Sequence, residues 1–161
     1  MMGAGKSSVA SLLAETLDGF SCIDVDNEIE NLANKKISDI FAEFGEDYFR
    51  KLETDVLKSV LMKGNQIVAT GGGIVEREEN RNLLKENGVT FYLMASVEEL
   101  YNRVKNYSHR PLLQNDNPQK ILEDLMTKRE KYYKMADFEI FTENKKVSEV
   151  VKEIVEKYET L

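Results

Sequence analysis

The sequence predicts one α/β domain over residues 1–161, built on a parallel β-sheet. Three observations lead to this class. Short apolar, strand-like segments alternate with helical segments, an order typical of parallel strands covered by helices. The chain opens with a glycine-rich loop of the phosphate-binding type that runs into a helix. Carboxylates and a run of glycines follow two strand-like segments, at the edge where parallel sheets bind ligands.

The elements follow from local patterns, taken in chain order. Val9, Leu12 and Leu13 recur at helical spacing, which predicts a first helix over about Ser7–Thr16. Apolar runs bounded by turn residues predict the strands Ser21–Val25, Gln66–Thr70, Val89–Ala95 and Phe138–Thr142. Further helices are predicted over residues 27–63, from about Val97, over Pro118–Tyr133, and in the C-terminal segment whose apolar face is Val147, Val150, Val151, Ile154, Val155 and Tyr158.

The first residues carry the end of the pattern G-x-x-x-x-G-K-[ST], in the run Gly3, Ala4, Gly5, Lys6, Ser7 and Ser8. The glycines let successive N–H groups turn toward a polyphosphate, and the helix N-terminus adds its positive dipole. Lys6 would reach the β- and γ-phosphates, and the Ser7 hydroxyl would ligate Mg²⁺. The alternative is a flexible N-terminal tail, but the helical spacing that follows favours the phosphate-binding loop.

The pattern requires a first glycine immediately before Met1 and, before that glycine, a buried strand. We expect the natural protein to carry about eight to ten further residues upstream, because this strand would lie at the centre of the sheet. Loss of a central strand would forfeit on the order of 8 to 15 kcal/mol of apolar burial. That loss is comparable with the stability of a whole domain, and it would divide the sheet in two.

Composition and charge limit the possible functions. The 161 residues are 42% hydrophobic, which suits one domain with a core. The net charge of −7 argues against nucleic acid as a partner, because such proteins present a basic face. No apolar run of about 18 residues occurs, so no membrane partner is expected. We expect a cytoplasmic monomer in which the single cysteine, Cys22, is a small buried thiol.

Two carboxylates, Asp24 and Asp26, stand at alternate positions near the end of the first strand and would point to the same side. Two acids so close repel each other unless cations lie between them. A Mg²⁺ ion held by Ser7, together with Lys6, would supply that compensation. The alternative is an exposed strand end at which the acids cap the next helix.

Several motifs occur in one order along the chain. After the loop and Asp24-Val25-Asp26 come Phe49-Arg50-Lys51-Leu52-Glu53, Ala69-Thr70-Gly71-Gly72-Gly73, Arg110-Pro111-Leu112-Leu113 and Arg129-Glu130-Lys131-Tyr132-Tyr133. The set resembles the shikimate kinases, over essentially the whole chain. A loop alone would fit any nucleotide kinase or GTPase, so the specificity comes from the ensemble.

The resemblance implies a P-loop fold of the nucleoside-monophosphate-kinase type. Its parallel five-stranded sheet would have the order 2-3-1-4-5 and be flanked by helices, with the first strand missing from this sequence. A substrate-binding region is expected over about residues 26–63 and a mobile lid over about residues 105–118. The substrates implied are shikimate and ATP, with Mg²⁺ as cofactor.

The resemblance also implies roles on the substrate side. Asp26 would hydrogen-bond the shikimate hydroxyls and orient or deprotonate the attacking one, while Asp24 would hold Mg²⁺. Arg50 and Arg129 would clamp the shikimate carboxylate, because two parallel N–H donors of a guanidinium match two oxygens. Substrate contacts are also expected at Gly71 and Gly72. Glu53 is expected to orient Arg50.

On the nucleotide side, the resemblance implies that Arg110 meets the transferring phosphoryl group as the lid closes, and that Arg103 stacks on adenine. The catalytic set is then Lys6, Asp26 and Arg110. One departure is the loop Phe141–Lys146, which lacks the proline often found against adenine in this family.

The leading hypothesis is therefore ATP-dependent phosphorylation of the shikimate 3-hydroxyl, giving shikimate 3-phosphate and ADP. A related small-molecule kinase of the gluconate type shares the loop and lid. An inactive kinase-like binding module is the alternative from a different class. The two arginines and the triple glycine favour shikimate, and retention of the catalytic set argues against decay.

Overall fold

The computed structural model describes residues 1–105 and 117–161. Its helices are α1 (Lys6–Thr16), α2 (Val25–Ala33), α3 (Ile37–Leu61), the 3-10 turn η1 (Ile74–Glu76), α4 (Glu78–Asn87), α5 (Val97–Val104), α6 (Pro118–Tyr133) and α7 (Val147–Tyr158). Its strands are β1 (Ser21–Asp24), β2 (Gln66–Ala69), β3 (Phe91–Met94) and β4 (Phe138–Phe141). Strands and helices thus alternate, as the sequence predicts.

The described strands form two separate parallel pairs, β1 with β2 and β3 with β4. Asp24 stands opposite Ala69 in the first pair, and Met94 stands opposite Phe141 in the second. The parallel pairing confirms the α/β prediction, and the division into two pairs is the one expected when a central strand is absent. The order of all five strands stays a prediction.

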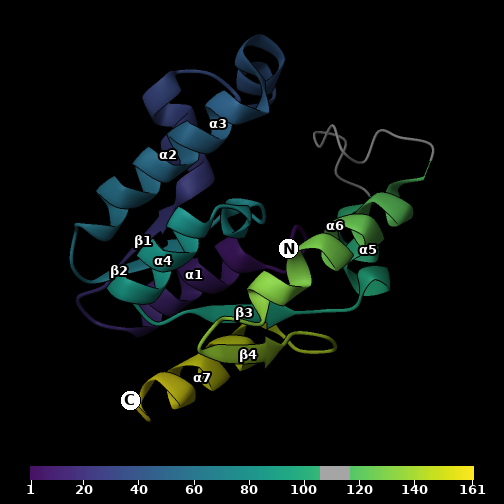
Figure 1. Ribbon diagram of the computed structural model, residues 1–161. Coiled ribbons are helices and arrows are strands. Elements are labelled where there is room, and N and C mark those ends of the chain that lie inside the picture. The colour runs from purple at the N-terminus through teal and green to yellow at the C-terminus, as the bar shows by residue number, and fades with distance from the viewer. Residues whose placement is uncertain (106–116) are drawn as a thin grey trace.

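The helices join the two pairs and cover them. Helix α1 packs on β1, β2 and α7, while α7 also covers β4. Helices α2 and α3 pack on each other and form a lobe at the top of Figure 1, opposite β4 and α7. None of the described helices is long and apolar enough to cross a bilayer.

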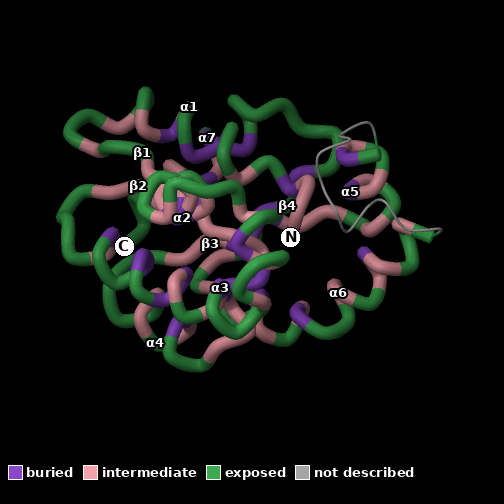
Figure 2. Tube along the Cα trace, turned by 90° about the horizontal axis from the view of Figure 1, so that it is seen from above, coloured by how far each residue is buried: buried purple, intermediate pink, exposed green. Residues whose placement is uncertain are grey.

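Two hydrophobic clusters make up the core, seen as purple segments in Figure 2. One lies beneath α1, α5, α6 and α7 and includes Leu100, Leu122 and Ile140, which are at most 1% exposed. The other lies between α2, α3 and η1 and includes Ile29 and Leu57, both fully buried. The phosphate-binding loop and the α2–α3 lobe therefore pack on separate hydrophobic clusters.

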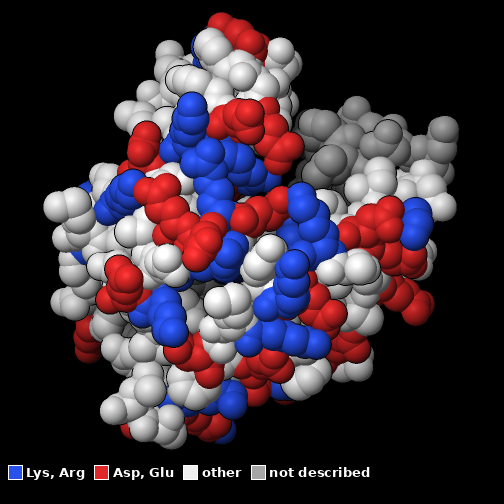
Figure 3. All heavy atoms as spheres, in the orientation of Figure 1, with Lys and Arg blue, Asp and Glu red and all other residues white. Residues whose placement is uncertain are grey.

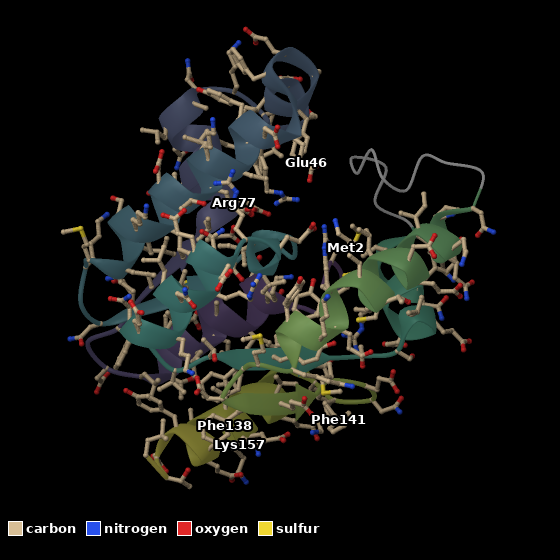
Figure 4. All side chains as sticks on the ribbon, viewed as in Figure 1. Met2, Glu46, Arg77, Phe138, Phe141 and Lys157 are labelled. Atoms are coloured by element: carbon tan, nitrogen blue, oxygen red, sulfur yellow. The ribbon has the colours of Figure 1, made fainter. Side chains whose placement is uncertain are left out.

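Aromatic packing holds the second strand pair against α7. The Phe91 and Phe138 rings stack across β3 and β4 with centroids 5.3 Å apart. The Lys157 ammonium of α7 lies 5.6 Å from the Phe138 ring centroid, and both side chains are labelled in Figure 4. The pair is thus stabilised by stacking and by a cation–π contact.

Several boundaries differ from the sequence-based expectation by a residue or two. The first strand ends at Asp24 because Val25 already begins α2, and the segment after the triple glycine forms η1 and α4, for which no element was predicted. Helix α6 has the bounds predicted. The expectation of a buried Cys22 is wrong, because the structure leaves this residue exposed.

Candidate active site

The phosphate-binding loop has the backbone that its glycines predict. Gly3 and Gly5 have φ of 76° and 86°, values that residues with a Cβ rarely adopt. A Cβ on Gly3 would also lie 2.8 Å from Cγ1 of Val104. Helix α1 begins at Lys6 with no side chain capping its first N–H groups. These donors and the dipole make the loop suited to an anion.

Lys6 and the residues around it lie at the start of α1. The Lys6 ammonium donates to the Met1 carbonyl over 2.6 Å, so its side chain folds back over the loop. Ala4 is 1% exposed and anchors the loop in the core, while Ser8 is exposed beside it. The structure therefore keeps the predicted loop residues together.

Asp24 connects this loop to α2. The Ser7 hydroxyl donates to Oδ2 of Asp24 over 2.6 Å. Oδ1 of Asp24 accepts the backbone N–H of Asp26 over 3.0 Å and thereby caps α2. Asp24 is thus a helix cap, as the alternative interpretation expected, and it also contacts the loop serine. Its role toward Mg²⁺ stays a prediction.

The triple glycine is explained by three side chains that lie against it. A Cβ on Gly71 would be 2.8 Å from Oδ1 of Asp26, and a Cβ on Gly73 would be 2.5 Å from the terminal nitrogens of Arg50. At Gly72 the Tyr133 hydroxyl donates to the carbonyl oxygen over 2.6 Å. Space, and not an unusual φ, is therefore what favours glycine at positions 71 and 73, whereas a Cβ at Gly72 would make only ordinary contacts.

The Arg50 side chain projects from α3 and is largely buried between acidic side chains. Its guanidinium donates to Glu53 over 2.9 Å and to Glu46 over 3.1 Å. Figure 4 shows Glu46 on the side of α3 that faces α6. Burial raises the pKa of Glu53, against the opposing effect of the Arg50 charge. The contact between Glu53 and Arg50 is the pairing that the family resemblance implies.

Arg129, on α6, is 7% exposed and points to the segment that follows the triple glycine. Its Nε and a terminal nitrogen lie 2.8 and 2.6 Å from the same oxygen of Glu76. A terminal nitrogen of Arg50 lies 3.9 Å from that oxygen, and Lys128 contacts the other oxygen of the carboxylate. The two predicted clamp arginines are thus brought to one acid.

Electrostatics at this cluster keep Glu76 charged. Burial alone would raise the pKa of Glu76, but hydrogen bonds from Lys128 and Arg129 outweigh burial and lower it. Figure 3 shows Lys and Arg gathered near the middle of this face, between the α2–α3 lobe and α6, with Asp and Glu among them. Arg50, Lys128 and Arg129 are therefore gathered at the site, each of them paired with an acid.

A second part of the site lies on the other side of the loop. Arg103 of α5 donates to the Thr142 hydroxyl over 3.1 Å and to its carbonyl over 3.0 Å, and is paired with Glu99 over 2.8 Å. A cavity of about 340 Å³ adjoins it, with lining residues that include Gly3, Gly5, Ser8, Arg103, Thr142 and Lys145. Part of the predicted nucleotide set thus lines one space, namely Gly3, Ala4, Gly5, Ser8 and Arg103, whereas Lys6 and Ser7 are not among its lining residues.

The structure brings together most of the predicted site residues. Arg110 and most of the predicted lid lie outside the described residues, so the structure does not place them. Sequence reasoning missed Glu76 and Thr142. No local pattern marks these residues, because their partners are distant in the chain.

Comparisons with known proteins agree with this geometry. The family model described as "Shikimate kinase" matches residues 2–159. The shikimate kinase of Thermodesulfovibrio yellowstonii is 44% identical over 160 residues, covering 99% of this chain and 92% of that protein. The shikimate kinase of Persephonella marina is 44% identical over 154 residues, covering 96% of this chain and 92% of that protein.

Solved structures give the same result. The shikimate kinase of Acinetobacter baumannii in complex with shikimate superposes with a TM-score of 0.94 at 36% identity, covering 99% of this chain and 89% of that one. The shikimate kinase of Aquifex aeolicus has a TM-score of 0.86 at 38% identity, covering 99% and 92%. The chain therefore belongs to the shikimate kinase family of ATP-dependent small-molecule kinases.

Proposed function

We propose that this protein transfers the γ-phosphoryl group of ATP to the 3-hydroxyl of shikimate, giving shikimate 3-phosphate and ADP. The observation that carries the proposal is the convergence of Arg50 and Arg129 beside the triple glycine, which also lies against Asp26. Two guanidinium groups from different helices suit a carboxylate on a small ring, and the acid suits its hydroxyls. The relative from Acinetobacter baumannii was solved with shikimate bound.

At the phosphate end, the loop N–H groups and Lys6 would hold the β- and γ-phosphates. The cavity beside Arg103 would receive the adenine, a role that its closeness to Gly3 and Gly5 supports. Arg110 would add positive charge at the transferring group. These donors act on charge that spreads over the equatorial oxygens, which is where phosphoryl transfer is stabilised.

At the acceptor end, the shikimate hydroxyl oxygen forms a bond to the γ-phosphorus as the bond from that phosphorus to the bridging oxygen of ADP breaks. Asp26 would orient the hydroxyl and accept its proton. Its place against Gly71 supports this role, since a Cβ there would displace the carboxylate. The backbone at Gly71 and Gly72 would contact the substrate.

The donor set between the loop and β1 fits Mg²⁺. Ser7 and Asp24, whose side chains are 2.6 Å apart, offer a hydroxyl and a carboxylate oxygen, the ligand types that Mg²⁺ takes beside water and phosphate. When bound, Mg²⁺ would neutralise charge on the phosphates. Asp24 and Ser7 would hold it, and the capping bond to α2 fixes the Asp24 carboxylate in place.

The five-strand order 2-3-1-4-5 is part of this proposal. The parallel pairs β1–β2 and β3–β4 support it, because they match the two outer pairs of that order. The central strand would lie between β2 and β3, where the described residues provide none. The substrate-binding region over residues 26–63 is supported by the place of Arg50 on α3. A monomeric state and a cytoplasmic location stay predictions from the sequence.

The test is ADP release with Mg-ATP and, in separate reactions, shikimate, gluconate or no acceptor. We expect release that depends on shikimate, and phosphorylation at the 3-hydroxyl when the product is examined by NMR. Release that depends on gluconate would assign the enzyme to a related small-molecule kinase. ATP binding without acceptor-dependent release would identify an inactive binding module.

A further inference from the structure

Glu76 occupies the junction of three elements around the predicted carboxylate clamp. It ends η1, directly after the triple glycine, and its carboxylate reaches Arg129 of α6 over 2.6 and 2.8 Å. The same carboxylate lies 3.9 Å from Arg50 of α3. Lys128, the neighbour of Arg129, contacts its second oxygen. One acid therefore links both arginines of the clamp.

The geometry of the Arg129 contact leaves that guanidinium able to bind a second anion. Glu76 uses Nε and one terminal nitrogen, both through a single oxygen. A guanidinium carries five N–H donors in a rigid fork, so an acid on one edge fixes the direction in which the other donors point. Glu76 thus orients Arg129 without using all of its donors.

We infer that Glu76 is a positioning residue for substrate binding, one that holds the Arg129 side chain of α6 against η1 and sets its distance from Arg50. The inference rests on the proposed function, because it takes the substrate to carry a carboxylate. Displacement of a binding group by about 1 Å can cost on the order of 100-fold in rate. Glu76 itself does not touch the substrate in this proposal.

The long side chain of an arginine needs such a restraint. Arg129 enters the site from α6 and Arg50 from α3, and these helices belong to separate core clusters or their margins. Their separation is therefore not set by one rigid element. Glu53 already restrains Arg50 at 2.9 Å, and Glu76 supplies the corresponding restraint for Arg129.

The experiment compares Glu76→Ala and Glu76→Gln with the unchanged protein in steady-state kinetics. We expect Glu76→Ala to raise KM for shikimate at least about ten-fold, because it releases Arg129. KM for ATP should stay within two-fold, because the other groups near this carboxylate, Lys128 and Arg50, are not among the predicted nucleotide contacts. Glu76→Gln keeps an oxygen that accepts from Arg129 and should recover most of the loss. Thermal unfolding of each variant measures any loss of stability.

The matched control is Glu79→Ala, which removes an acid of the neighbouring helix α4. Glu79 pairs with Lys58 at 2.5 Å, and its side chain is 52% exposed. It should leave both KM values unchanged. Turnover by the unchanged protein reports on the proposed function, and the ratio between variants reports on Glu76, so the two can fail separately.

Two results would overturn the inference. A lower KM for shikimate in both Glu76 variants would mean that the carboxylate competes with the substrate for the arginines. Equal increases in both KM values, accompanied by a lower unfolding temperature, would mean that Glu76 has a structural role only. Rescue by glutamine at unchanged stability is the outcome that a merely structural residue would not produce.

Discussion

Replacement of Gly73 with alanine should displace Arg50 by a distance that the structure defines. A Cβ at this position would lie 2.5 Å from both terminal nitrogens of Arg50, so the guanidinium must retreat by about 0.9 Å to reach the 3.4 Å of ordinary contact. Gly73 itself has φ −87° and ψ −7°, the conformation of the third residue of a type I turn, which is open to alanine. The perturbation is therefore confined to the arginine.

The expected effect is on substrate binding and not on folding. Glu53 and Glu46 tie the guanidinium in place, so a shift of this size breaks its alignment with the substrate carboxylate. We expect kcat/KM for shikimate to fall about 10- to 100-fold. Stability should change by less than about 1 kcal/mol, because the atoms that must move end a flexible side chain.

The assay is the initial rate of ADP release with shikimate varied at saturating Mg-ATP, and then with ATP varied at saturating shikimate. Gly64→Ala is the matched control, because nothing lies within 4 Å of a Cβ at Gly64. A value of kcat/KM within two-fold of the unchanged protein would refute the argument that the position of Arg50 against Gly73 governs binding.

Three further predictions concern other residues. Asp26→Asn should lower kcat about 100-fold or more at saturating shikimate, and near-normal turnover would contradict a proton-accepting role. Arg129→Ala should raise KM for shikimate about 10- to 100-fold and leave KM for ATP unchanged, whereas equal effects would contradict the clamp. Hydrogen bonds from Thr90 lower the pKa of the Asp137 carboxyl below its usual 3.8. The charged carboxylate therefore stabilises the folded protein above pH 3.8, and this contribution is lost as the pH falls through the lowered pKa. Asp137→Asn should therefore lower the free energy of unfolding by about 0.5 kcal/mol at pH 7, a difference that urea titrations should find absent well below pH 3.8.

The local parts of the fold could be predicted because their causes are local. Pro118 at the first turn and the apolar spacing after it predict α6 to the residue. The strands were placed within two residues at each end, although Val25 was assigned to the first strand and instead begins α2. Exposure of Cys22 was missed because an apolar run does not reveal which face of the strand other elements cover.

In the candidate site, too, contacts within one element could be predicted and contacts between elements could not. The family resemblance paired Glu53 with Arg50, and the contact forms because residues three positions apart on a helix lie side by side. Glu76 could not be paired with Arg129, 53 positions away, nor Thr142 with Arg103, because their contacts exist only once separate elements pack.

The sequence by itself therefore determined the alternation of strands and helices, the phosphate-binding loop and the family, since each is written in short patterns and their order. Only the tertiary structure decided which side chains the triple glycine must accommodate and which acid joins the two arginines. The physical reason is that spacing along the chain fixes neighbours within one helix or strand. Contacts between elements depend instead on how their apolar faces are buried together.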